Sequence, residues 1–152
     1  MAYVSAEARQ ELLDTIADAI DELGAALAAL GEAYEQLDER AADTLEEQLF
    51  RPVQTAYGKA QRTYAGFAQR FGLSARTFAP ATRGVPSTGV KGFVADAVTA
   101  VGQADADLAE LQDSMMPVEV GDAELRAGLA DVRELLTDVR GRADGLLRTF
   151  GR

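Results

Sequence analysis

The residues best suited to chemistry lie in residues 84–92, which read Gly-Val-Pro-Ser-Thr-Gly-Val-Lys-Gly. A nucleotide-binding phosphate loop requires Gly-Lys-Ser/Thr in succession after a strand. Here Val90 separates the glycine from the lysine, Gly92 replaces the hydroxyl residue, and no strand pattern precedes the segment. The sequence therefore argues against a nucleoside triphosphatase.

A weaker anion-binding site is the alternative for this segment. Arg83, Ser87, Thr88 and Lys91 would gather two cations and two hydroxyls at the N-terminus of a helix expected to begin near residue 88. The amide groups and dipole of a helix N-terminus favour anions. We prefer the simpler interpretation, in which Ser87 or Thr88 caps an ordinary helix after a loop.

The composition argues against other catalytic classes. The chain contains no cysteine and no histidine, so thiol catalysis, the commonest general base and the commonest transition-metal ligand are all missing. Di-iron helical bundles need inward-facing Glu-x-x-His pairs, which this chain cannot supply. We therefore predict no catalytic, cofactor-binding or metal-binding residues, no cofactor and no enzymatic activity.

Charge is strongly segregated along the chain. Residues 48–95 contain seven bases and no acid, whereas residues 95–125 contain eight acids and no base. The seven bases are Arg51, Lys59, Arg62, Arg70, Arg76, Arg83 and Lys91. Bases interleaved with aromatics can bind single-stranded nucleic acid, but five of the six aromatics here occupy predicted core positions. We favour ion pairing of this basic stretch with acidic neighbouring helices, and the net charge of −10 makes nucleic acid an unfavourable partner.

The elements that must position these residues follow from hydrophobic periodicity. Within residues 13–37 apolar side chains alternate at steps of three and four, the heptad pattern of a helix packed lengthwise on others. Similar seams recur in three further segments. They predict an all-α protein, an elongated up-down-up-down antiparallel four-helix bundle with a heptad, coiled-coil-like core. We expect a single domain over residues 1–152, with helices at about 5–41, 44–71, 88–116 and 122–150.

Several local signals set the expected helix ends. Residues 44–47 form a capping box that would start the second helix, with Pro52 kinking it early; the alternative is that the first helix continues to Leu49. Gly72 should end the second helix in the left-handed conformation, and Asp122 should cap the last. Residues 73–88 should form a long loop. In an antiparallel pairing of the last two helices, Arg133 can approach Asp105.

These observations favour a non-enzymatic helical adaptor, scaffold or assembly protein that acts through protein–protein contacts or self-association. One alternative is an anion- or nucleic-acid-binding module that uses the basic residues between 51 and 91. Another is an amphipathic protein that coats a lipid or polymer surface. The sequence shows no transmembrane segment and no signal-peptide pattern, so we expect a cytoplasmic protein, and the excess of arginine over lysine suggests a bacterial source.

Overall fold

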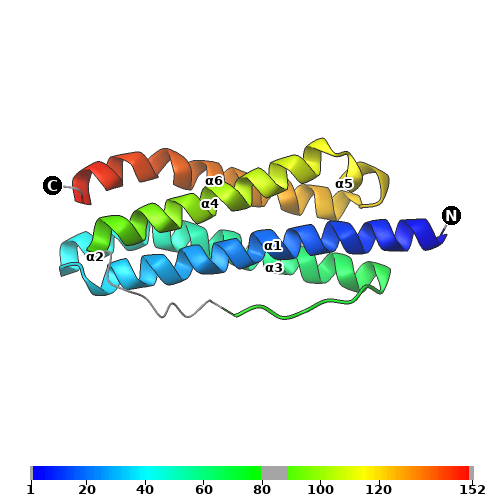
Figure 1. The fold of residues 1–152 in the computed structure, drawn as a ribbon, viewed down its shortest axis with the longest axis horizontal. Coiled ribbons are helices and arrows are strands. Elements are labelled where there is room, and N and C mark those ends of the chain that lie inside the picture. The colour runs from blue at the N-terminus through cyan, green and yellow to red at the C-terminus, as the bar shows by residue number, and fades with distance from the viewer. Residues whose placement is uncertain (1, 80–88, 151–152) are drawn as a thin grey trace.

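The computed structural model describes residues 2–79 and 89–150, and throughout these ranges the regular secondary structure is helical (Figure 1). This confirms the all-α prediction. The elements in chain order are α1 (Ala2–Glu35), α2 (Glu39–Leu45), a π-helix (Glu46–Phe50), α3 (Arg51–Phe71), α4 (Gly89–Asp113), α5 (Met116–Glu119) and α6 (Ala123–Phe150). No helix in these ranges is both long and apolar enough to cross a membrane.

Most of the side chains in the four predicted seams are buried together in one core. Leu23, Leu30, Phe67, Val101 and Leu136 are all at most 1% exposed. Several seam residues near helix ends are only partly buried, and two are exposed, Tyr34 at 39% and Met115 at 51%. Tyr34 lies in the last turn of α1 and Met115 lies beyond the end of α4. Each sits where its helix leaves the packed region, so periodicity alone overestimates burial at helix ends.

The long helices do not follow the predicted up-down-up-down order. Arg70, near the end of α3, pairs with Asp122, just before α6, and the Arg9 Nε near the start of α1 donates to the Val120 carbonyl beyond α4. The ends of α3 and α4 therefore lie together, and the two helices run in the same direction (Figure 1). Each is antiparallel to α1 and α6.

The connection between α3 and α4 is long enough for the two helices to run in the same direction. A crossover must return along the whole of α3, which at 21 residues is about 32 Å long. Residues 73–88 can span roughly 50 Å when extended, which is sufficient. Helix bundles with one long crossover are a known alternative to the simple up-down order.

The first helix boundary also differs from the prediction. α1 ends at Glu35, and α2 begins at Glu39 with Asp38 as its N-cap, whose carboxylate accepts the Ala41 amide at 2.9 Å. Thr44 lies inside α2 and donates to the Arg40 carbonyl, so it does not cap a helix. Both sequence alternatives, a turn at residues 40–44 and a helix continuing to Leu49, are wrong because Asp38 supplies the earlier cap.

The predicted irregularity at Pro52 takes the form of a π-helical turn over Glu46–Phe50. The Arg51 amide donates to the Glu46 carbonyl, five residues back. Proline lacks an amide hydrogen and crowds the preceding turn, so a wider turn just before Pro52 relieves both problems. The helical path therefore continues from α2 into α3.

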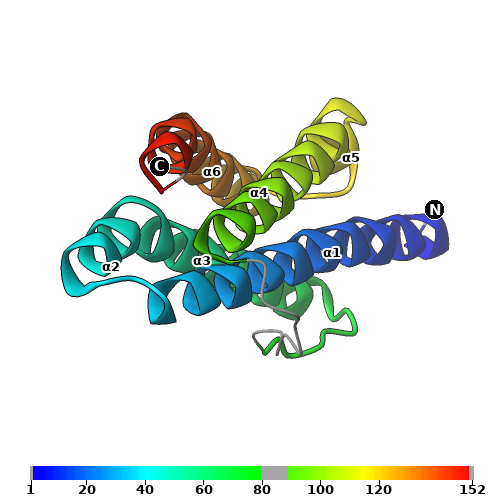
Figure 2. The same ribbon diagram turned by 60° about the vertical axis from the view of Figure 1, so that its left-hand side comes forward.

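The segment that follows α3 lies along the outside of α1 and α3 (Figure 2). As predicted, Gly72 ends α3 in the left-handed conformation, with φ of 63°. The Arg76 amide donates to the Tyr64 hydroxyl at 3.1 Å, and Arg76 also forms an ion pair with Asp21. Phe78 packs edge-on against Tyr64. Residues 73–79 are therefore anchored to both α1 and α3.

Candidate functional site: a charged groove between α3 and α6

The predicted anion site is represented in the structure by one residue. Lys91 lies exposed in the first turn of α4, while Arg83, Ser87 and Thr88 fall outside the described residues. No described residue joins Lys91 to form a binding constellation. The proposal of an anion site at residues 83–91 therefore stays a prediction.

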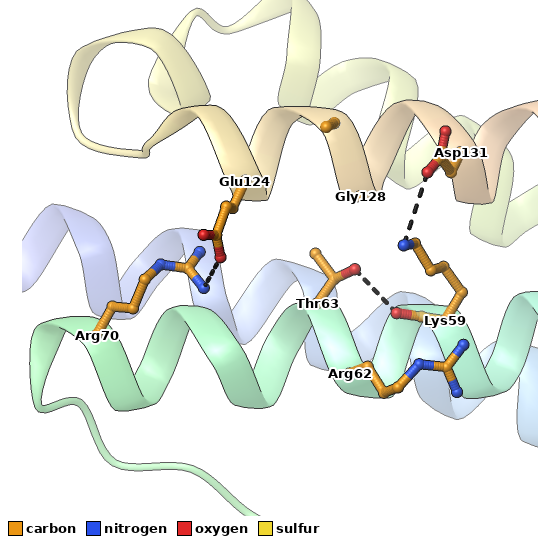
Figure 3. A pocket seen from close by; sticks show the side chains of 8 residues that line it. Lys59, Arg62, Thr63, Arg70, Glu124, Gly128 and Asp131 are labelled. Carbon is orange, nitrogen blue, oxygen red and sulfur yellow. Dashed lines mark hydrogen bonds and ion pairs between the residues drawn. The ribbon is translucent and has the colours of Figure 1, made fainter.

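The structure instead brings charged residues together in a groove between α3 and α6 (Figure 3). The groove has a volume of about 420 Å³ and is open to solvent. Its walls are formed by Lys59, Arg62, Thr63 and Arg70 from α3 and by Glu124, Ala127, Gly128 and Asp131 from α6. We call these residues the α3–α6 groove. Cations line one wall and carboxylates line the other.

Small residues on α6 explain why a hollow exists here. Gly128 is pressed against Thr63, and a Cβ at position 128 would lie 2.7 Å from the Thr63 Cγ2 and closer still to its Oγ1. Only glycine permits this close approach of the two helices. Ala127 beside it also has a short side chain. The long charged side chains of the lining come from both helices (Figure 3).

Ion pairs across the groove fix most of its charges. The Lys59 Nζ lies 3.6 Å from Asp131, and the Arg70 Nη1 lies 2.8 Å from Glu124. Arg70 also makes two hydrogen bonds to Asp122, through Nε at 2.5 Å and Nη2 at 2.9 Å. These bonds, together with the Leu125 amide that Asp122 caps, lower the pKa of Asp122 although partial burial opposes the shift. Asp122 thus serves as the predicted N-cap of α6 and as the anchor for Arg70.

Arg62 differs from its neighbours because no carboxylate in the described part of the chain pairs with it. Its exposed side chain projects from α3 at the rim of the groove (Figure 3). Thr63 cannot offer its hydroxyl hydrogen to a ligand without losing a bond, because Oγ1 donates to the Lys59 carbonyl at 2.9 Å. Arg62 is therefore the groove's available cation.

The aromatic residues of the basic stretch do not provide a stacking surface. Tyr57, Tyr64 and Phe67 are buried, and Phe50, Phe71 and Phe78 are partly buried against the core. Three of the bases, Lys59, Arg70 and Arg76, are held in ion pairs. These contacts agree with the preferred interpretation of the sequence, that the basic stretch pairs with acidic neighbours.

A second charged cluster joins α4 to α6. Asp105, only 5% exposed, accepts from the Arg133 Nε at 2.9 Å and from the Arg140 Nη1 at 3.1 Å. Arg133 also donates to Gln112 at 2.7 Å. The approach of Arg133 to Asp105 is the contact predicted from the sequence. Since all four side chains are bonded within this cluster, its geometry indicates helix alignment rather than ligand binding.

The groove had no motif that sequence analysis could have recognised. Its three cations were part of the basic stretch, but its carboxylates belong to another helix and meet the cations only through the α3–α6 register. Among the described residues no group of three or more acidic side chains is arranged to hold a metal ion. The groove offers charged side chains that can form hydrogen bonds and ion pairs with a ligand.

No family model matches this chain, and no curated protein or solved structure matches it.

Proposed function

We propose that the protein is a non-enzymatic adaptor or scaffold, built as a bundle of its four long helices, that binds a helical segment of a protein partner in the α3–α6 groove. The observation that carries this proposal is the pairing of a cationic wall on α3 with an acidic wall on α6. Charged residues that flank a helix seam select partner and orientation more than they add stability.

The length of the groove suits a partner helix. On α6 the lining residues recur at positions 124, 127, 128 and 131, which is the i, i+3, i+4, i+7 pattern of one helix face. The lining on α3 runs from Lys59 to Arg70, about 16 Å along the helix. This length matches about three turns of a partner helix, and helices recognised in grooves present anchors at the same spacing.

Arg62 gives the groove a preference for an acidic anchor. Its guanidinium can form a bidentate pair with a carboxylate, while the neighbouring cations already have carboxylate partners. A partner helix with a carboxylate opposite Arg62 and mixed charges elsewhere would complement both walls. Nucleic acid would instead be repelled by Glu124 and Asp131, which already pair with Arg70 and Lys59.

Charge reversal of the groove tests this function. Tagged wild-type protein and the double variant Lys59→Glu/Arg62→Glu would be used to capture partners from the cells that produce the protein. We expect a specific protein to be recovered with the wild type and reduced at least tenfold with the variant. Arg62→Glu would repel an acidic anchor, and Lys59→Glu would add a second carboxylate beside Asp131. Partners would be quantified by mass spectrometry and the bound nucleic acid by its absorbance.

A matched control carries the same change of charge elsewhere. Arg40→Glu/Lys91→Glu also replaces one arginine and one lysine, both exposed, on α2 and α4. We expect this control to recover the partner like the wild type. Equal recovery with both variants, loss only with the control, or recovery of nucleic acid in place of protein would contradict the proposal.

A further inference from the structure

A pair of carboxylic acids meets at the interface between α1 and α4, away from the α3–α6 groove. Glu22 lies on α1 and Asp107 on α4, and these two helices have the most extensive contact in the described part of the chain. The charged groups that act on Glu22 are all carboxylates, Asp18 and Asp21 on its own helix and Asp107 opposite. α3 also packs against α1 but contributes no charge to Glu22.

The atomic environment of Glu22 favours its protonated form. Its Oε2 is buried and receives no hydrogen bond from any donor among the described residues, while the Asp107 side chain lies within hydrogen-bonding range. Asp107 already accepts a hydrogen bond from the Gln103 Nε2 at 3.0 Å. Two ionised carboxylates cannot hydrogen-bond, whereas a protonated Glu22 can donate to Asp107.

The same arrangement changes the acidity of Glu22. Burial contributes most to the change, followed by the hydrogen bond with Asp107 and then by repulsion from Asp107, Asp18 and Asp21. Together they raise the pKa of Glu22 from 4.5 to about 8. At neutral pH Glu22 is therefore mostly protonated in the folded chain.

We propose that Glu22 and Asp107 share one proton and form a proton-dependent clasp that holds α1 against α4 and loosens in alkaline solution. Loss of the proton would leave two negative charges facing each other, with Asp18 one turn earlier on α1 and Asp21, which pairs with Arg76, next to Glu22 in the sequence. In other proteins, two carboxylates that share a proton titrate as a coupled pair, and the pKa of one of them is strongly raised. The clasp involves no residue of the α3–α6 groove, so it stands independently of the proposed function.

The direction of the pH dependence follows from linkage. Between pH 4.5 and about 8 the folded chain holds a proton on Glu22 that the unfolded chain has released. Raising the pH through this window therefore lowers the stability contributed by Glu22. The contribution is complete below pH 4.5 and is lost above about pH 8.

The variant Glu22→Gln tests the clasp because its amide can donate to Asp107 at every pH. We expect the Tm of this variant to exceed that of the wild type by an amount that grows by about 4 °C or more between pH 5 and 8. Glu32→Gln is the matched control, since Glu32 is exposed on the same helix. Its Tm difference from the wild type should stay constant over that range.

Carbon-13 NMR of the glutamate side-chain carboxyls in the wild type provides the direct measurement, with Glu22 assigned by its absence from the Glu22→Gln spectrum. We expect one glutamate to titrate near pH 8 and, in Asp107→Asn, to titrate at least one pH unit lower because the new amide donates to ionised Glu22. If Glu22→Gln does not fold, the shift in Asp107→Asn assigns the resonance. Titration of every glutamate near pH 4.5, or a constant Tm gap, would overturn the proposal.

Discussion

At the scale of single residues, the stability that a charged side chain contributes depends on its burial and on its ion-pair partners. Asp105 is almost completely buried and holds two arginines, whereas Asp131 is well exposed and holds one lysine at 3.6 Å. Exposed pairs contribute about 0–1 kcal/mol because water and salt screen them. A buried carboxylate with two charge-assisted hydrogen bonds contributes more, and its loss leaves both arginines without their carboxylate partner.

Replacing Asp105 by alanine should therefore lower the free energy of unfolding by about 1–3 kcal/mol, a range reduced because Arg133 and Arg140 are partly exposed and can turn to water. Asp131→Ala, which removes one exposed carboxylate, should cost less than about 1 kcal/mol. Urea unfolding of both variants checks the difference. Equal losses would show that Asp105 does not anchor α4 to α6.

Of the two charged contacts between helices, Arg133–Asp105 could be predicted from the sequence and Glu22–Asp107 could not. Arg133 and Asp105 could be paired in advance because α4 and α6 are joined by a short turn, and their antiparallel register follows from its position. Glu22 and Asp107 could not, because no short turn joins α1 to α4 and nothing in the sequence sets the register of one helix against the other. Periodicity identifies which face of a helix is buried and says nothing about which distant helix covers it.

At the scale of elements, the contact between α3 and α6 depends on one glycine. Gly128 admits Thr63 at a distance no Cβ would tolerate, whereas Gly102 on α4 has open space around it. Alanine is favoured over glycine in a helix by about 1 kcal/mol. The steric contact and the helix propensity therefore oppose each other at position 128 and not at position 102.

Gly128→Ala should destabilise the protein by about 1–3 kcal/mol, because overpacking outweighs the gain in helix propensity. Gly102→Ala should instead stabilise it by up to about 1 kcal/mol. Adding Thr63→Ala to Gly128→Ala should recover most of the loss, and a double-mutant cycle measured by urea unfolding gives the coupling. Additive effects of the two substitutions would contradict the close contact.

The presence of the long helices could be predicted from the sequence, whereas the end of α1 and the direction of α4 could not. The seams identified the long helices because burial of an apolar face follows directly from spacing. The end of α1 was misplaced because Asp38 and the capping box at residues 44–47 are both credible N-terminal signals, and only packing selects between them. A 16-residue connection is also long enough for either a hairpin or a crossover, so sequence alone left the direction of α4 undetermined.

At the scale of the whole molecule, the charge segregation seen along the chain becomes pairing in space. The basic stretch supplies α3 and the segment after it, and its ion pairs reach Asp21 on α1, Glu124 and Asp131 on α6, and the α6 cap Asp122. Composition could predict this neutralisation. It could not show that the pairs line an open groove with one cation left over, because that depends on the small residues at positions 127 and 128 facing α3.

The central claim, that the α3–α6 groove binds a protein helix, is tested most directly by site-specific photo-crosslinking in the producing cells. A photoreactive amino acid would replace Ala127, which is exposed in the groove, or Thr99, which is exposed on α4 as the control. We predict a crosslink from position 127 to one protein, mapped by mass spectrometry to a helical segment with an acidic residue, and none to that segment from position 99. Crosslinks from position 127 to nucleic acid, or the same products from both positions, would contradict the account.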